Sequence, residues 1–413
     1  MYRHSNDLKE GGTLRMERGR RDRTEEVDLT RRKDAISPPG LGGQSDDPGT
    51  TRKNRFYLPT LDGYRALAIL LVLMVHGTDR IFAPRGTHPN GKMWFICLSG
   101  NHGVDLFFVL SGFLITTRLI EEFRRTGRMD LRAFYLRRAF RILPASITFL
   151  CVAGALGLLG IIHFTNLRLE LFSCLTFWRN YLIFPVQTGW YTGHFWSLST
   201  EEHFYLVWPA VVILLAPEGA LPLAIGSVLA GMYCGVILHE STSHLPWPFL
   251  VEMRSISYLA SGCAAALVLG RPAMRAWVTE HLTPVAWGAI FVLALVAVRV
   301  PRMGCALPAC LALLIVGTVL HPGWRVSRML ENRTLRWIGS ISYSLYLWQQ
   351  LFLLRIDVPA DLAIQNSLWR FIPPFLCAAA SYYLVEKPML RVGHSFVKRW
   401  DVTENATDAR QAA

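Results

Sequence analysis

Long apolar stretches recur from Tyr57 onward, each bounded by short polar or Pro/Gly-rich connections. About 20 apolar residues in a helix cross a hydrocarbon core roughly 30 Å thick. A helix also satisfies its own backbone polar groups, as lipid-exposed structure requires. The sequence therefore predicts an all-α, polytopic transmembrane helix bundle. Ten spans are expected, at residues 60–77, 95–117, 142–162, 203–217, 221–238, 254–270, 283–300, 303–320, 338–356 and 366–385.

The composition excludes several other classes of protein. Of 413 residues, 52% are hydrophobic and 18% are charged, against about 45–50% and 25% in soluble domains. A soluble multi-domain enzyme, a disordered protein and a secreted disulfide scaffold are excluded. The 8 cysteines are scattered without metal-ligand spacing, so no metal site is expected. No internal repeat is visible, which lowers the case for a secondary transporter.

Three regions are expected along the chain. Residues 1–55 hold 13 Lys or Arg and 10 Asp or Glu, and they predict a disordered polar cytoplasmic tail. This tail has no apolar region of a cleaved signal peptide, and its mixed charges do not favour nucleic-acid binding. Residues 56–392 form the predicted membrane domain. Residues 393–413 form a polar C-terminal tail.

The arginines predict the orientation in the membrane. Basic clusters precede the first span, follow the second, precede the ninth and follow the tenth. All of them lie in the cytoplasm if the number of spans is even and both termini are inside. Ten spans meet this condition if residues 168–200 form a non-crossing, re-entrant segment on the outer side. An eleven-span alternative breaks the rule, so we expect a multi-pass protein of a bacterial inner (plasma) membrane with cytoplasmic termini.

The first span carries ionisable residues inside its apolar run. Arg65 and His76 are 11 residues apart, an angular offset of about 20° and a rise of about 16 Å on one helix face. Asp62 lies three residues before Arg65 and joins the same stripe. Charged groups at membrane depth are costly and usually functional. The alternative is that these side chains extend to the two membrane interfaces.

The second span contains the polar residues Asp105 and Ser111. Gly103 and Gly112 would allow a neighbouring helix to approach closely. Ser111 and Gly112 could serve this packing or face a substrate.

Three arginines, Arg137, Arg138 and Arg141, lie within one and a half turns at the expected inner boundary. They could mark the cytoplasmic side, or they could form a cluster whose guanidinium groups bind phosphate oxygens.

The segment 194–209 concentrates polar and aromatic side chains at the start of a span. Aromatic faces and carboxylates together are typical of a site for a saccharide or another hydroxyl-bearing acceptor. Interfacial aromatic residues explain part of this pattern but leave the paired glutamates unexplained. The residues are His194, Trp196, Ser197, Ser199, Glu201, Glu202, His203 and Tyr205.

These motifs together resemble the acyltransferase-3 family of membrane O-acyltransferases, over roughly residues 56–392. The matching segments, in the family's order, are LDGYRALAILLVLMVHG, GVDLFFVLSGFLIT, RRAFRILP, HFWSLSTEEHFYLVWP, ISYSLYLW and YYLVEKP. The spacing of Arg65 and His76 is the family's core motif. One departure is visible, because Gln349 follows ISYSLYLW where the family commonly has His.

The resemblance implies transfer of an acyl group, commonly acetyl, from cytoplasmic acyl-CoA to a hydroxyl of a surface or lipid-linked saccharide. A lipid or a small macrolide-type molecule is the alternative acceptor. Acyl-CoA acts as co-substrate and no bound cofactor is expected. The expected partners are acyl-CoA, the acceptor and the bilayer, while the oligomeric state stays open. A transporter of an anionic solute and a non-catalytic scaffold are the other classes considered.

His76 is the expected general base, with an acyl-histidine as the alternative. Glu201 is expected to orient His76 or to bind the acceptor. Arg65 is expected to be catalytic together with His76 and Glu201. It is also expected to bind acyl-CoA together with Arg137, Arg138 and Arg141. A third group is expected to bind the acceptor or to support the site: Asp62, Asp105, Ser111, Trp196, Ser197, Ser199 and Tyr205.

Overall fold

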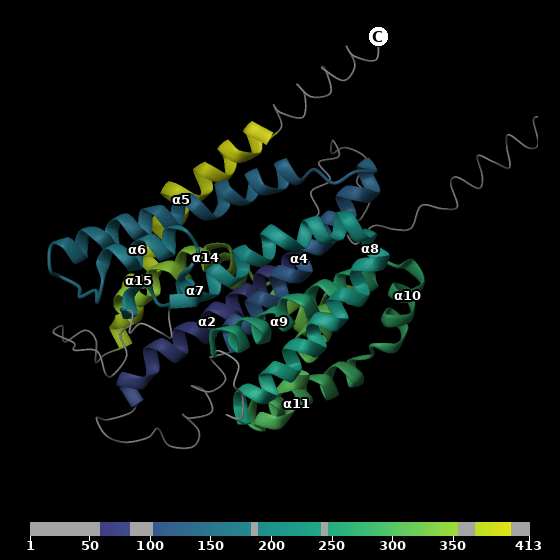
Figure 1. Ribbon diagram of the computed structural model, residues 1–413. Helices are drawn as coiled ribbons and strands as arrows, with labels where there is room; N and C mark the ends of the chain where they lie inside the picture. Colours follow the sequence, from purple (N-terminus) through teal and green to yellow (C-terminus); the bar gives the residue numbers. More distant parts are fainter. Residues whose placement is uncertain (1–57, 83–101, 183–188, 241–246, 354–367, 398–413) are drawn as a thin grey trace, which may run out of the picture. The chain divides into compact units, whose positions relative to one another are not determined.

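The computed structural model (Figure 1) describes residues 58–82, 102–182, 189–240, 247–353 and 368–397. Within these ranges all regular structure is helical, so the predicted all-α class is confirmed. The helices are α2 (Pro59–Phe82), α4 (His102–Thr126), α5 (Leu131–Leu158), α6 (Leu167–Leu175), α7 (Arg179–Leu182), η1 (Trp190–Thr192), α8 (Phe195–Glu240), α9 (Trp247–Leu269), α10 (Pro272–His281), α11 (Pro284–Arg299), η2 (Pro301–Ala306), α12 (Leu307–Leu320), α13 (Arg325–Leu330), α14 (Arg333–Phe352), η4 (Leu368–Phe371), α15 (Ile372–Ser381) and η5 (Tyr382–Glu386).

Six helices of the described residues are long and apolar enough to cross a membrane. The count rises to seven if α9 and α10, which meet at an angle of 105°, form one bent span. The apolar helix α11 is shorter, with 16 residues. The described parts of the ten predicted spans are mainly helical, whereas residues 95–101, 354–356 and 366–367 of these spans lie outside the described residues. The number of membrane crossings stays a prediction.

The predicted fourth and fifth spans lie in the two arms of α8. This helix of 46 residues is broken at Ala216, whose φ of 54° and ψ of 167° are not helical. Pro217 follows the break and has no N–H for a helical hydrogen bond. Large side chains near the break are open to the surroundings, such as Leu214 with 81% exposure, as expected where lipid covers a helix.

The arginine cluster 137–141 lies inside a helix, whereas the sequence placed it in a loop before a span. Helix α4 continues to Thr126 and α5 begins at Leu131. Asp130 caps α5, because its side chain accepts a hydrogen bond from the backbone N–H of Ala133 at 3.0 Å. Pro144 is tolerated within this helix. The arginines therefore project from a rigid element.

The segment 168–200 contains α6, α7, η1 and the start of α8. The first three have 9, 4 and 3 residues, far fewer than the roughly 20 needed to cross the bilayer. This agrees with a non-crossing segment. Residues 183–188 lie outside the described residues.

The core forms where α2 packs against α4 and α14, and α4 packs against α9. The predicted close approach at Gly103 and Gly112 is confirmed. A Cβ on Gly112 would collide with the carbonyl of Leu259 on α9, and one on Gly103 would collide with the carbonyl of Ala68 on α2. Figure 1 shows α2, in purple, beside α4. These contacts hold α2 in the middle of the membrane domain.

The two predicted tails lie largely outside the described residues, which exclude 1–57 and 398–413. The final helical stretch continues to Val397, five residues beyond the expected end of the membrane domain.

Candidate functional site

Two adjoining cavities, of about 680 and 640 Å³, lie among α2, α4, α5, α8 and α14. Both are lined by Arg65, Ser111, Arg138 and Arg141. The second is also lined by Arg118 and Arg137. Helix packing thus brings together the arginine of the first span and the arginine cluster of α5, as the sequence led us to expect.

Three of these five arginines already have carboxylate partners. Arg65 lies 3.2 Å from Asp62, and Arg137 lies 3.3 Å from Glu122. Arg138 lies 3.1 Å from Glu201.

Arg118 and Arg141 have no carboxylate within 4.0 Å among the residues that the structure describes. The cavity therefore carries uncompensated positive charge, which suits an anionic ligand such as a phosphate.

Glu201 accepts several hydrogen bonds at the junction of the two cavities. Its Oε1 accepts from the hydroxyls of Ser111 and Tyr205 and from the guanidinium of Arg138. That guanidinium also lies over the Tyr205 ring, 3.4 Å from its centre. The predicted residues Ser111, Tyr205, Arg138 and Glu201 therefore form one unit, which joins α4, α5 and α8. We name it the Glu201 cluster.

His76 has a different partner from the one that the sequence suggested. Its Nδ1 lies 2.8 Å from Oε1 of Gln349 on α14, and its ring meets Trp190 edge-on at 5.3 Å. Glu201 instead accepts hydrogen bonds from Ser111, Arg138 and Tyr205. Glu201 was expected to orient His76. In the structure Gln349, the position at which this chain departs from the family pattern, contacts the His76 ring.

Ser197 and Tyr346 lie between the first cavity and His194. Both line the first cavity, and their hydroxyl oxygens are 2.5 Å apart. Tyr346 also donates to the backbone carbonyl of His194 at 3.0 Å. The side chain of His194 contacts Gln350, the residue after Gln349. Consecutive glutamines on α14 therefore each hold one imidazole.

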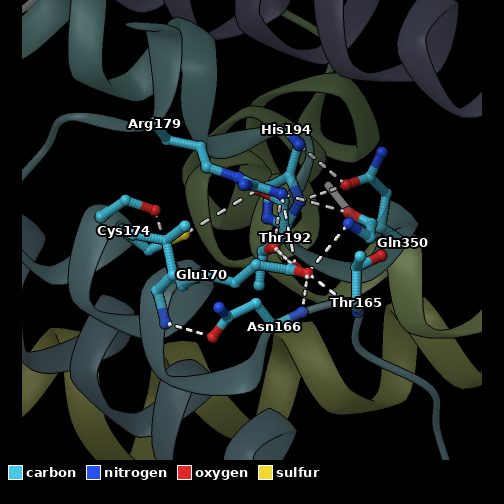
Figure 2. A network of polar contacts seen from close by, with 11 residues as sticks. Thr165, Asn166, Glu170, Cys174, Arg179, Thr192, His194 and Gln350 are labelled. Carbon is cyan, nitrogen blue, oxygen red and sulfur yellow. Dashed lines mark hydrogen bonds and ion pairs between the residues drawn. The ribbon is translucent and has the colours of Figure 1, made fainter. Parts of the chain in front are cut away.

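A buried ion pair anchors the chain just before His194 (Figure 2). Glu170 and Arg179 are both fully buried and lie 3.4 Å apart. Glu170 also accepts from the Thr192 hydroxyl at 2.8 Å and from the Gly189 N–H at 3.0 Å. Arg179 donates to the carbonyls of Gly189 and Thr192. These bonds fix η1 and thereby Trp190 against His76.

Burial shifts the pKa of Arg179 in this ion pair and of the neighbouring Cys174. It lowers the pKa of the Arg179 guanidinium, and nearby Cys174 and Glu170 partly offset that effect. Burial also raises the pKa of the Cys174 thiol to about 12. Cys174 is therefore a neutral packing residue at physiological pH.

Three predicted residues do not line either cavity themselves. Asp105 is bound by Arg254 at 2.8 Å and His102 at 2.7 Å, which makes it structural support between α4 and α9. Trp196 meets the Phe108 ring edge-on at 6.2 Å. Ser199 donates to the carbonyl of Phe195 within its own helix.

Sequence reasoning missed several residues of the site. Arg118 was read only as a sign of the cytoplasmic side, although it lines the second cavity. Glu170 and Arg179 stand outside any predicted span or charge cluster that could have marked them, and Gln350 lies within the predicted span 338–356 without a motif of its own. Gln349 was visible only as a departure from the family motif.

Comparison with known proteins gives a consistent result. Residues 58–385 match the family model of an acyltransferase domain. The chain is 28% identical to the peptidoglycan O-acetyltransferase OatA of Listeria monocytogenes, over 83% of this chain and 57% of that protein. It is 26% identical to the O-acetyltransferase OatA of Staphylococcus aureus, over 82% and 58%. It is 27% identical to a putative O-acetyltransferase of Staphylococcus aureus, over 83% and 59%.

The chain spans less than three fifths of the length of these curated relatives. No solved structure matches it. Because the family model covers most of the chain, the chain belongs to this family of acyltransferases.

Proposed function

We propose that this acyltransferase moves an acetyl group from acetyl-CoA, bound on the cytoplasmic side, to a hydroxyl of a cell-envelope saccharide. One observation carries the proposal: α2 joins an arginine-lined cavity at Arg65 to a histidine, His76, held by Gln349. The separation of eleven positions corresponds to about 16 Å along the helix. A CoA thioester likewise separates its phosphates from its reactive carbonyl by a long, slender arm.

The donor's phosphates would bind in the arginine-lined cavities. Arg118 and Arg141 provide charge that is not neutralised by an adjacent carboxylate. The Glu201 cluster fixes Arg138 between the cavities. The pantetheine arm would run from the first cavity along α2 toward His76, which does not line that cavity.

His76 would act as general base toward the acceptor hydroxyl. The carbonyl Oε1 of Gln349 can only accept a hydrogen bond, so Nδ1 of His76 carries the proton. In the neutral ring Nε2 then holds the lone pair. The hydroxyl oxygen attacks the thioester carbon as Nε2 takes its proton, and the thiolate of CoA leaves and is protonated.

The proposed class of acceptor, a cell-envelope saccharide, is supported by the names of the relatives. One is named for peptidoglycan O-acetylation, and the others are named for O-acetylation without an acceptor. In the expected orientation the arginines, and the donor that they would bind, face the cytoplasm. A glycan hydroxyl outside the inner membrane would then approach from the opposite side.

The test is mass spectrometry of envelope glycans from cells that express wild-type protein, His76→Ala, or no protein. We expect acetylated glycan only with the wild type. His163→Ala is the matched control, since His163 is exposed and lies in the connection between α5 and α6, and it should retain wild-type acetylation.

An unchanged glycan profile with wild-type protein would contradict the saccharide acceptor. Activity of His76→Ala at the wild-type level would remove His76 from the mechanism. Acetyl label that remains on acid-quenched protein and requires His76 would replace the general base by an acyl-histidine.

A further inference from the structure

Gln349 is buried, and the nitrogen of its side-chain amide has no hydrogen-bond partner among the described residues. Its side chain is 0% exposed, and its Oε1 accepts from His76. Its Nε2 is buried with no hydrogen-bond partner in the described structure. An unsatisfied buried donor costs about 1–3 kcal/mol of stability, so its presence beside the proposed base calls for an explanation.

Two other side chains of α14 next to Gln349 compare with it. The Nε1 of Trp348 is also buried without a partner. Gln350 is buried, and its Oε1 accepts from the backbone N–H and the ring of His194. Among these three side chains, Gln349 combines an unsatisfied N–H with a contact to His76.

The functional group that is missing from the proposed reaction is a donor for the oxyanion. When a hydroxyl attacks a thioester carbonyl, the carbonyl oxygen becomes negatively charged. A preorganised N–H in a dry site stabilises this charge strongly, and Asn or Gln side chains provide it in other acyl transfers. Gln349 has such an N–H, fixed in a buried position through its contact with His76.

We propose that Nε2 of Gln349 donates a hydrogen bond to the thioester carbonyl oxygen in the transition state. This inference rests on the proposed function and adds a catalytic residue to it. As the acceptor oxygen bonds to the carbonyl carbon, the C=O electron pair moves to oxygen and Nε2 of His76 takes the proton. The oxyanion then re-forms the double bond, expels the CoA thiolate and leaves the acetyl ester. His76 returns its proton to the thiolate.

One amide would thus serve two atoms of the reaction. Its oxygen holds the proton on Nδ1 of His76, and its nitrogen faces the developing negative charge. Two further contacts hold His76 in place. Trp190 packs edge-on against the ring, and Arg370 on η4 donates to the backbone carbonyl of His76 at 3.4 Å.

Gln349→Glu separates the two roles of the amide. The carboxylate keeps an acceptor for Nδ1–H, as the aspartate of a Ser-His-Asp triad does, but it cannot donate to an oxyanion. We expect kcat to fall by about 10²–10³, the loss that follows removal of one oxyanion donor, while KM for acetyl-CoA stays within about threefold. Gln349→His restores an N–H and should retain more of kcat than Gln349→Glu.

Gln350→Glu is the matched control, because it makes the same change one residue later and leaves the contact to His76 in place. Its kcat per folded protein should fall less than that of Gln349→Glu, because Gln350 holds His194 rather than His76. Thermal unfolding in detergent identifies variants that do not fold. If Gln349→Glu does not fold, Gln349→Met supplies the second test, since it also lacks a donor and carries no charge.

A kcat of Gln349→Glu or of folded Gln349→Met within about threefold of wild type would overturn the oxyanion role. An equal loss in Gln350→Glu would also overturn it, because the effect would then come from a buried charge on α14. Turnover by wild type, and its loss in His76→Ala, are measured in the same assay. Inactive wild-type protein would reject the proposed function together with this inference, whereas active wild type with active Gln349→Glu rejects this inference alone.

Discussion

The arginines that line the cavities differ in whether a carboxylate pairs with them. Arg137 is neutralised by Glu122 and Arg138 by Glu201. Arg141 lines both cavities and has no carboxylate partner among the described residues. A phosphate would therefore gain most from Arg141, since no existing ion pair has to be broken.

Arg141→Ala should raise KM for acetyl-CoA more than it lowers kcat. A hydrogen bond to a charged group contributes about 1.5–3 kcal/mol, which corresponds to roughly a tenfold to hundredfold change in affinity. Steady-state kinetics in liposomes measures both constants. Arg137→Ala is the comparison, and its effect should be smaller because Glu122 already engages that charge.

S-acetylpantetheine, which lacks the nucleotide phosphates, provides the decisive control. Its turnover should be equally slow with wild type and Arg141→Ala. If Arg141→Ala slows this truncated donor as much as acetyl-CoA, Arg141 does not bind phosphate.

Contacts between distant residues account for most of what the sequence did not reveal about the site. The stripe of Asp62, Arg65 and His76 follows from the period of one helix, so it was predictable. The bond of His76 to Gln349 joins residues 273 positions apart. No local pattern encodes such a pairing, because it depends on how α2 packs against α14.

At the scale of elements, the buried pair Glu170–Arg179 holds η1 in place. Both side chains are fully buried, so the loss of one partner leaves an uncompensated charge in a dry environment. Such a loss typically costs 3–5 kcal/mol. Because η1 places Trp190 against His76, damage here should affect both stability and turnover.

Glu170→Gln should lower the unfolding temperature and reduce acetyl transfer. Thermal unfolding and the transfer assay measure the two effects. Glu122→Gln is the matched control, because its ion pair with Arg137 is 25–36% exposed and is expected to contribute about 0–1 kcal/mol. Equal unfolding temperatures for the two variants would refute a structural role of the buried pair.

Helix boundaries show a second limit of sequence reasoning. The polar run after the second predicted span looked like a loop, because hydropathy alone ends a span at the first charges. The N-cap of Asp130 and the break at Gly127, with its φ of 72°, confine the connection to a few residues. The arginines consequently belong to the ends of two helices, which is why they can line a cavity.

At the scale of the whole molecule, the positive-inside rule and the broken helix α8 together fix a testable topology. The connection between α5 and α6, which contains His163, should face outward. The first arm of α8 should then return to the cytoplasm at the break beside Glu218. Both residues are exposed, so a cysteine at either position should be accessible to a reagent.

His163→Cys and Glu218→Cys in a cysteine-free background should therefore react from opposite sides of the membrane. A membrane-impermeant maleimide should label His163→Cys in intact cells, and Glu218→Cys only after the membrane is opened. Arg128→Cys, in the arginine-rich connection between α4 and α5, is the cytoplasmic control. Labelling of Glu218→Cys in intact cells would mean that α8 does not return to the cytoplasm at Ala216. The predicted fourth and fifth spans would then be wrong, while the arginine cavity on α2, α4 and α5 would keep its cytoplasmic side as long as Arg128→Cys stayed protected.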